Sequence, residues 1–228
     1  MIRGLIIIFS TVLASLLLVG IILYPFNQPT EVFRKLLHFV VVIDSIIWVY
    51  LIDDWKIFSL CMLIFMAVAY PILQLFELSP KIMNFLPQRK SGEFKKSLLA
   101  LGFMFIVVIA IGEGFLESRA LSLAAIMAWG PGDGAAALIG KRYGKTKIGK
   151  GKKKSLEGSS AMFILSFISV LTVILFNHLF EVPQAIIVTL ITSFITTIIE
   201  LLILSGYDTF FCPVGAMIVL AICKYLFI

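Results

Sequence analysis

Long apolar segments separated by short polar ones dominate the pattern of this chain. The first runs from Gly4 to Tyr24 without a charged residue, and it lacks the alternation of a transmembrane β-strand. A bilayer core requires about 20 mostly apolar residues per helix. We therefore predict an all-α, polytopic transmembrane helical bundle of about eight spans, or seven, forming a single membrane domain over 1–228. The spans are expected at roughly 4–25, 36–52, 57–76, 94–112, 120–140, 158–177, 185–204 and 210–227.

Two of these spans contain conspicuous polar residues. The span at 36–52 contains His38 and Asp44, and the span at 120–140 is expected to be interrupted at 129–134, which read Trp-Gly-Pro-Gly-Asp-Gly. Asp44 is assigned no role, and pairing with another helix is one interpretation of it.

Composition excludes the other broad classes of protein. Hydrophobic residues make up 61% of the chain and charged residues 14%, whereas a soluble domain has about 45–50% and about 25%. Neither a soluble globular protein nor a disordered one is compatible with so much apolar surface. The three cysteines form no Cys-x-x-Cys pair, so neither a disulfide framework nor a thiolate metal site is indicated.

The positive charges predict the orientation in the membrane. The net charge is +6, and fifteen of the 19 Lys and Arg residues fall in loops or at span ends on one side of the expected spans. Positive residues collect on the cytoplasmic side, so that side is expected to be cytoplasmic and both termini to lie outside. We therefore attribute the excess of Lys and Arg to orientation in the membrane and expect no nucleic-acid partner.

One expected span combines an acidic residue with glycines. Residues 130–142 read Gly-Pro-Gly-Asp-Gly-Ala-Ala-Ala-Leu-Ile-Gly-Lys-Arg. A carboxylate within a span costs about 2.5–3.5 kcal/mol on insertion scales, which makes Asp133 a functional hypothesis. Gly132 and Gly134 would let the backbone approach a ligand or break the helix. Two interpretations remain open: a magnesium-phosphate or catalytic carboxylate, and a kinked packing helix in which Asp133 is satisfied.

A loop rich in glycine and lysine follows at 144–160. Free amides, mobile cations and hydroxyls are what phosphate binding requires, and Ser155 or Ser159 would stand at the N-terminus of the sixth span. Glu157 would hold magnesium or cap a lysine. The alternative is a basic loop that attracts acidic lipids. Three residues rather than four separate Gly140 from Gly144, and no strand is expected before them, so the loop is not a Walker P-loop.

Further polar residues lie at the same expected face. Arg34 and His38 are four apart, hence on one helical face, although histidines near membrane interfaces are usually structural. A polar stripe at helical spacing would line a cavity, or its hydroxyls would form hydrogen bonds within the helix or with neighbouring helices. Asp208 would extend the acidic rim of such a cavity. The stripe consists of Thr189, Thr192, Ser193, Thr196, Thr197 and Glu200.

Three segments in this order are typical of one family: Arg34-Lys35-x-x-His38, then 132–140 (Gly-Asp-Gly-Ala-Ala-Ala-Leu-Ile-Gly), then 153–159 (Lys-Lys-Ser-Leu-Glu-Gly-Ser). With them the chain resembles, over most of its length, the CTP-dependent lipid kinases related to dolichol kinase, phytol kinase and the yeast-type diacylglycerol kinase. The resemblance implies transfer of the γ-phosphate of CTP, with Mg²⁺ or another divalent cation, to a lipid alcohol from the inner leaflet. Where the family tends to have an Asp-Asn pair, this chain has Asp208-Thr209.

The residues and the resemblance together predict a site at the cytoplasmic face. A phosphatidate cytidylyltransferase-like enzyme and a small transporter are the alternatives. A cytidylyltransferase usually has a late Asp-Arg signature that is absent here. A transporter would not require the glycine-lysine-serine loop. The predicted residues are catalytic Asp133, Glu157 and His38; nucleotide-binding Gly132, Gly134, Lys141, Arg142, Lys153, Lys154, Ser155, Gly158 and Ser159; metal-binding Asp133, Glu157 and Glu200; and, for the lipid or another part of the site, Arg34 and Asp208.

Overall fold

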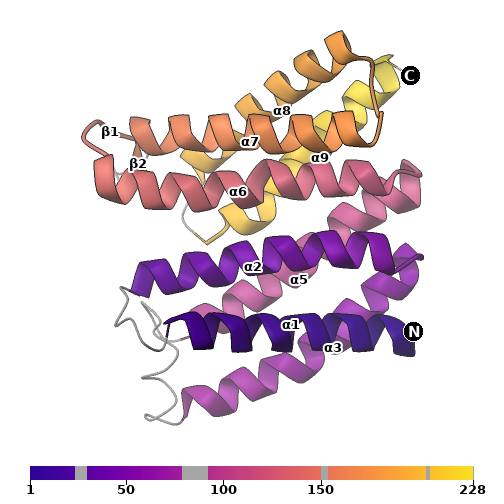
Figure 1. The fold of residues 1–228 in the computed structure, drawn as a ribbon, viewed down its shortest axis with the longest axis vertical. Helices are drawn as coiled ribbons and strands as arrows, with labels where there is room; N and C mark the ends of the chain where they lie inside the picture. Colours follow the sequence, from indigo (N-terminus) through magenta and orange to yellow (C-terminus); the bar gives the residue numbers. More distant parts are fainter. Residues whose placement is uncertain (24–29, 79–91, 150–153, 204–205, 228) are drawn as a thin grey trace. The chain divides into compact units, whose positions relative to one another are not determined.

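Long helices account for nearly all of the described structure (Figure 1). The computed structural model describes residues 1–23, 30–78, 92–149, 154–203 and 206–227. The elements are α1 (Ile2–Leu23), α2 (Thr30–Leu51), α3 (Trp55–Glu77), α5 (Glu93–Ile109), the π-helical turn η1 (Ala110–Phe115), α6 (Arg119–Tyr143), β1 (Lys147–Ile148), β2 (Lys154–Ser155), α7 (Leu156–Phe176), α8 (Val182–Leu202) and α9 (Asp208–Phe227).

The predicted spans are confirmed as helices. Within the described residues, seven helical segments are long and apolar enough to cross a membrane, with η1 extending α5. The remaining long helix is α2, which also carries Arg34, Lys35 and Asp44. These are the helices of an integral, multi-pass membrane protein. The outward location of both termini stays a prediction.

The expected interruption of the fifth span is wrong, because α6 continues through Pro131 from Arg119 to Tyr143. Pro131 has no amide hydrogen, so the carbonyl four residues earlier, that of Met127, loses its helical donor and the turn around it is crowded. Polar side chains of neighbouring transmembrane helices can support the backbone near such a site. Here the Ser166 hydroxyl of α7 donates to the Ala128 carbonyl, within one turn of Pro131. The neighbouring helix therefore supports the backbone where the sequence alone suggested a break.

The described chain divides into two compact units, Met1–Ile106 and Val107–Ile228. In the first unit, polar contacts join α1 to α2. The Ser15 hydroxyl lies 3.0 Å from both carboxylate oxygens of Asp44, and the Trp48 indole donates to Thr11 Oγ1 at 2.8 Å. Asp44 thus pairs across helices, as one interpretation of the sequence held. The single domain predicted over 1–228 stays a prediction.

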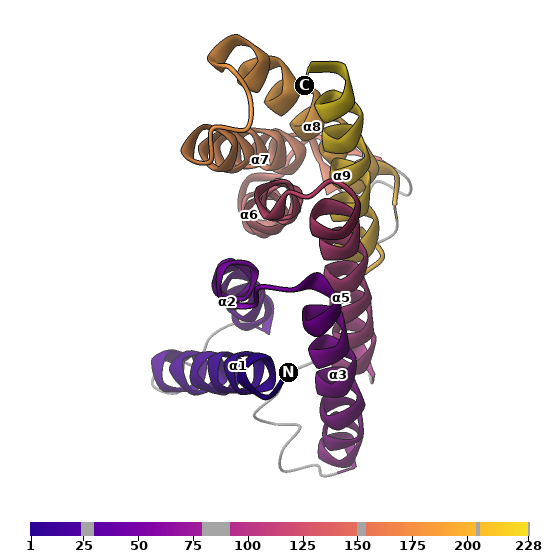
Figure 2. The same ribbon diagram turned by 90° about the vertical axis from the view of Figure 1, so that its right-hand side faces the viewer.

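In the second unit, α6 and α7 make the most extensive contact among the described elements. Figure 1 shows them side by side, and Figure 2 shows both nearly end-on. Residues four apart share a helical face, and Gly132, Ala136 and Gly140 form such a face on α6. It meets a face of α7 that includes Gly158 and Met162. The small residues let the two backbones approach closely.

Local signals explain where several helices begin. Ser118 caps α6 by accepting a hydrogen bond from the Leu121 amide at 3.4 Å. Asp54 caps α3 by accepting from the Lys56 amide at 2.7 Å. At the start of α8, Glu181 forms a reciprocal capping box with Gln184. Caps of this kind satisfy amides that have no partner within the first turn.

Candidate functional site

The β1–β2 hairpin joins α6 to α7 and carries part of the loop predicted to bind phosphate. Its strands pair antiparallel, with Lys147 opposite Ser155. The Leu156 amide donates to the Thr146 carbonyl at 2.9 Å and ties the hairpin to the base of α7. Successive side chains of a strand point to opposite faces, so Lys154 and Ser155 are directed toward different neighbours.

Ser155 is a buried hydroxyl enclosed by glycines. Its Oγ accepts a hydrogen bond from the Gly158 amide at 3.2 Å and caps α7. A Cβ added to Gly140, Gly144 or Gly158 would lie 3.0, 2.5 or 3.1 Å from this oxygen. The prediction that Ser155 stands at a helix N-terminus is confirmed, and Ser159 is buried in the first turn of the same helix.

Glu157 binds the backbone of the preceding loop. Its Oε1 accepts hydrogen bonds from the Lys145 amide at 3.2 Å and the Thr146 amide at 3.1 Å. Its Oε2 is buried and has no hydrogen-bond partner among the described residues. The carboxylate therefore holds the Lys145–Thr146 turn against α7, while its predicted roles in metal binding and catalysis stay predictions.

Lys154 joins the hairpin to the end of α8. Its Nζ lies 2.6 Å from Glu200 Oε1, and the same ammonium donates to the Glu200 backbone carbonyl. That carbonyl belongs to the last turn of α8, where backbone oxygens lack helical partners and a cation is favourable. Glu200 is only 6% exposed, and its Oε2 has no hydrogen-bond partner within the described part of the chain.

Two further carboxylates lie near this ion pair. Asp133 of α6 and Asp208 of α9 are close enough to Glu200 to interact with it electrostatically, and all four charged groups act on the buried Cys212 thiol. Asp208 Oδ1 also accepts hydrogen bonds from the Gly206 and Thr209 amides, at 3.0 and 2.9 Å. In this four-residue charged cluster (Asp133, Lys154, Glu200 and Asp208), three carboxylates face one ammonium, which leaves two negative charges.

The polar stripe of α8 is buried along its whole length. Three of its hydroxyls satisfy themselves within the helix, since Thr192, Thr196 and Thr197 donate to carbonyls four residues earlier at 2.7–2.8 Å. The Thr189 and Ser193 hydroxyls are buried without a hydrogen-bond partner in the described residues. The interpretation of a self-satisfied stripe is thus confirmed for three of its hydroxyls.

Two of the glycines predicted to bind nucleotide, Gly132 and Gly158, have a packing role. A Cβ added to Gly132 would lie 3.0 Å from Met162 Cγ and 3.1 Å from the Met162 carbonyl. A Cβ on Gly158 would lie 2.9 Å from the Ala136 carbonyl. Gly134 is buried in α6, two residues after Gly132. The spaces beside Gly132 and Gly158 are therefore filled by the neighbouring helix.

The other predicted residues are distributed as follows. Lys141 and Arg142 are exposed in the last turn of α6, and Lys153 lies outside the described residues. Arg34 and His38 belong to the first unit, on α2, where Arg34 pairs with Glu93 at 3.0 Å and His38 packs edge-on against Phe39. Their predicted roles in catalysis and lipid binding stay predictions.

The charged cluster is compatible with a magnesium ion that arrives together with a nucleotide. Among the described residues, no three His, Cys, Asp or Glu side chains are close enough to hold a metal by themselves. Magnesium is usually held by one or two carboxylates together with water and substrate phosphates. The carboxylate oxygens of the cluster and its two excess negative charges fit this mode. Of the predicted metal ligands, the cluster contains Asp133 and Glu200.

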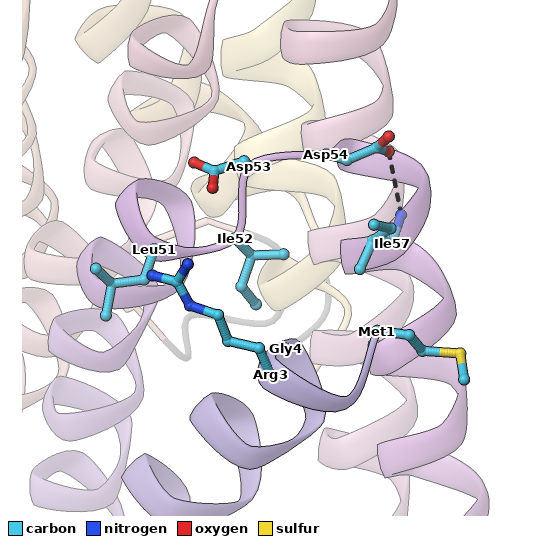
Figure 3. Close-up of a pocket in the computed structure, with 8 residues that line it drawn as sticks. All are labelled: Met1, Arg3, Gly4, Leu51, Ile52, Asp53, Asp54 and Ile57. Atoms are coloured by element: carbon cyan, nitrogen blue, oxygen red, sulfur yellow. Dashed lines mark hydrogen bonds between the residues drawn. The ribbon is translucent and has the colours of Figure 1, made fainter.

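A separate small hollow of about 130 Å³ lies in the first unit (Figure 3). It is lined by Arg3, Asp53 and Asp54 together with apolar side chains. Asp54 is engaged with the backbone of α3, as the dashed line to Ile57 shows. None of the predicted site residues lines this hollow.

Comparison with curated proteins gives one informative similarity. The chain is similar to a probable phytol kinase. The match to that chloroplastic protein of Triticum aestivum is 30% identical over 128 residues, covering 53% of this chain and 43% of the relative. The chain thus spans less than half of the relative's length. No family model matches the chain, and no solved structure matches it.

The sequence predicts both residues of the ion pair but not their contact. Lys154 is a predicted nucleotide ligand and Glu200 a predicted metal ligand, and they are 46 positions apart. No short-range spacing could have indicated the pair. The only sequence signal was that both residues were expected at the cytoplasmic ends of their spans.

Proposed function

We propose that this chain is a lipid-alcohol kinase that transfers the γ-phosphate of CTP to the hydroxyl of a membrane lipid alcohol. The charged cluster beside the glycine- and lysine-rich hairpin supports the proposal most strongly, because carboxylates for a metal and a lysine for phosphates lie together. The similarity to a probable phytol kinase supports it independently and suggests an isoprenoid alcohol as the acceptor.

The chemistry requires alignment and charge neutralisation rather than a covalent intermediate on the protein. Lys154 and the hairpin amides would bind the phosphates. Asp133 and Glu200 would hold Mg²⁺ together with phosphate oxygens, and the ion would supply charge neutralisation. The lipid oxygen forms a bond to the γ-phosphorus as the bond to CDP breaks, and a carboxylate of the cluster accepts the hydroxyl proton.

The proposed location of the reaction is the cytoplasmic face. The distribution of basic residues supports this side, since fifteen of 19 lie in loops or at span ends at one face of the expected spans and positive residues are retained in the cytoplasm. A lipid hydroxyl at the inner leaflet and a cytosolic nucleotide would then reach the same helix ends.

The test uses purified protein in mixed lipid-detergent micelles with Mg²⁺ and a panel of phytol, longer polyprenols, diacylglycerol and phosphatidate. CTP is supplied in two forms, labelled at the γ- or the α-phosphate. A kinase incorporates only the γ-label into lipid, whereas a cytidylyltransferase acting on phosphatidate incorporates only the α-label. Transfer from γ-labelled ATP but not CTP would refute the choice of nucleotide, and no label in any lipid would refute the function.

The Asp133→Asn variant links the activity to the charged cluster. It removes one negative charge at nearly constant volume, and we expect transfer to fall at least 100-fold, in the range typical for groups that stabilise a transition state. The matched control is Asp53→Asn, an exposed carboxylate of the first unit, which should retain activity. Near-normal turnover in Asp133→Asn would exclude Asp133 from the site.

A further inference from the structure

The Lys154 ammonium lies where the proposed function requires a metal cation. It is 2.6 Å from Glu200 Oε1, and Glu200 is one of the two carboxylates proposed above to hold Mg²⁺. Two of the three donors of this ammonium are engaged by the Glu200 carboxylate and the Glu200 backbone carbonyl, so binding nucleotide phosphates through more than one donor would draw it away from Glu200. The two proposed contacts of Lys154 therefore compete.

The flexibility of lysine and the anchoring of the hairpin allow an exchange between these contacts. Lysine carries its charge on a flexible four-carbon stem with three donors. The hairpin also rests on α8 at a second point, since a Cβ added to Gly149 would lie 3.2 Å from the Leu201 carbonyl. The hairpin can thus stay on α8 while the Lys154 side chain turns away from Glu200.

The state of Glu200 indicates that it can take a second cation. Its Oε2 is buried and has no hydrogen-bond partner among the described residues, and a buried carboxylate oxygen in that condition is costly. Asp133 and Asp208 add negative charge around it. A divalent cation at this position would satisfy both the oxygen and the excess charge.

We propose that Lys154 occupies the cation position of the metal site until nucleotide binds, and that it then moves from Glu200 to the phosphates. This inference rests on the proposed function and adds a positioning role for the Lys154–Glu200 pair. Metal alone competes with the ammonium, and nucleotide alone must compete with the carboxylate for the lysine. Metal and nucleotide together satisfy both, so each strengthens the binding of the other.

The experiment measures binding without any lipid acceptor. Mn²⁺ binding to the full chain in micelles is followed by electron paramagnetic resonance without nucleotide, and CTP binding is measured without metal in EDTA. We expect Lys154→Met to bind Mn²⁺ about tenfold more tightly than the unmodified protein, because a competing positive charge is gone, and to bind CTP more weakly. We expect Glu200→Gln to do the opposite, with tighter metal-free CTP and weaker Mn²⁺.

The opposite signs separate exchange from a structural clasp. A lysine that only stabilises the fold would weaken both ligands in both variants, and that result would overturn the proposal. Because removing one partner of a buried ion pair is often strongly destabilising, thermal unfolding is measured for each variant. If Lys154→Met does not fold, Glu200→Gln decides: unchanged or weaker binding of metal-free CTP refutes the exchange.

One control variant and a comparison with the kinase assay define the remaining outcomes. Lys56→Met removes an exposed lysine of the first unit and should leave Mn²⁺ binding unchanged; an equal gain there would attribute the effect to net charge and overturn the exchange. If the binding data follow the expected signs but no lipid is phosphorylated, the exchange stands and the kinase proposal fails. If lipid is phosphorylated but the signs are absent, the kinase proposal stands and the exchange fails.

Discussion

Substitution of Gly158 by alanine tests the close packing of α6 against α7. The new Cβ would lie 2.9 Å from the Ala136 carbonyl oxygen and 3.2 Å from Gly140 Cα, whereas ordinary contacts begin near 3.4 Å. Both neighbours are backbone atoms of α6, which cannot turn aside as a flexible side chain can. The two helices must therefore separate by about half an ångström at this point.

The size of the effect follows from the contacts that such a separation weakens. Each close atom pair contributes about 0.1–0.2 kcal/mol, and a gap of about 0.5–1 Å forfeits a quarter to a half of it. Overpacked sites typically lose about 1–3 kcal/mol, while alanine regains up to about 1 kcal/mol in helix propensity. We expect a net loss of about 1–2 kcal/mol in the free energy of unfolding.

The assay is reversible unfolding in mixed detergent micelles, followed by tryptophan fluorescence and circular dichroism. Gly20→Ala is the matched control, because nothing lies within 4 Å of its added Cβ and it is exposed in α1. It should be neutral or slightly stabilising. If Gly158→Ala is as stable as Gly20→Ala, the close approach of α6 and α7 at Gly158 is refuted.

Two further variants test individual polar contacts. Glu157→Ala removes the acceptor for the Lys145 and Thr146 amides, so we expect faster tryptic cleavage of the hairpin and weaker CTP binding. Glu157→Gln keeps an acceptor oxygen and should behave like the unmodified protein. Equal cleavage in both variants would show that the Glu157 carboxylate does not hold the hairpin. Thr189→Val replaces a buried hydroxyl that has no hydrogen-bond partner in the described residues, and we expect it to raise the free energy of unfolding by about 1 kcal/mol. A loss of stability would show that the hydroxyl is satisfied.

The helices could be predicted because the lengths of apolar segments depend only on local sequence. An apolar run such as Gly4–Tyr24 must span the bilayer or be buried away from water in some other way. The beginning of α7 at Ser155 was also predictable, since capping is decided within a few residues. The continuity of α6 was not, because the donor that supports its backbone near Pro131 is Ser166, on another helix.

The candidate site shows the same limit. Its acidic residues could be named from the sequence because carboxylates are unusual within apolar segments. Their partners could not be named. Glu157 was expected to meet a metal or a lysine but accepts hydrogen bonds from two backbone amides. The lysine that meets Glu200 follows from a tertiary contact between the hairpin and α8.

The glycines around Ser155 restrict how this part of the sequence can change over evolution. Only 3% of Ser155 is exposed, and Gly140, Gly144 and Gly158 each leave space that its side chain already occupies. An alanine at Gly140 would press first on the hydroxyl that caps α7, whereas an alanine at Gly144 or Gly158 would press first on a backbone oxygen of α6, which a smaller residue at 155 would not move. Changes at these glycines are therefore expected to be rare over evolution, because each would disturb either the cap of α7 or the close approach of the α6 and α7 backbones.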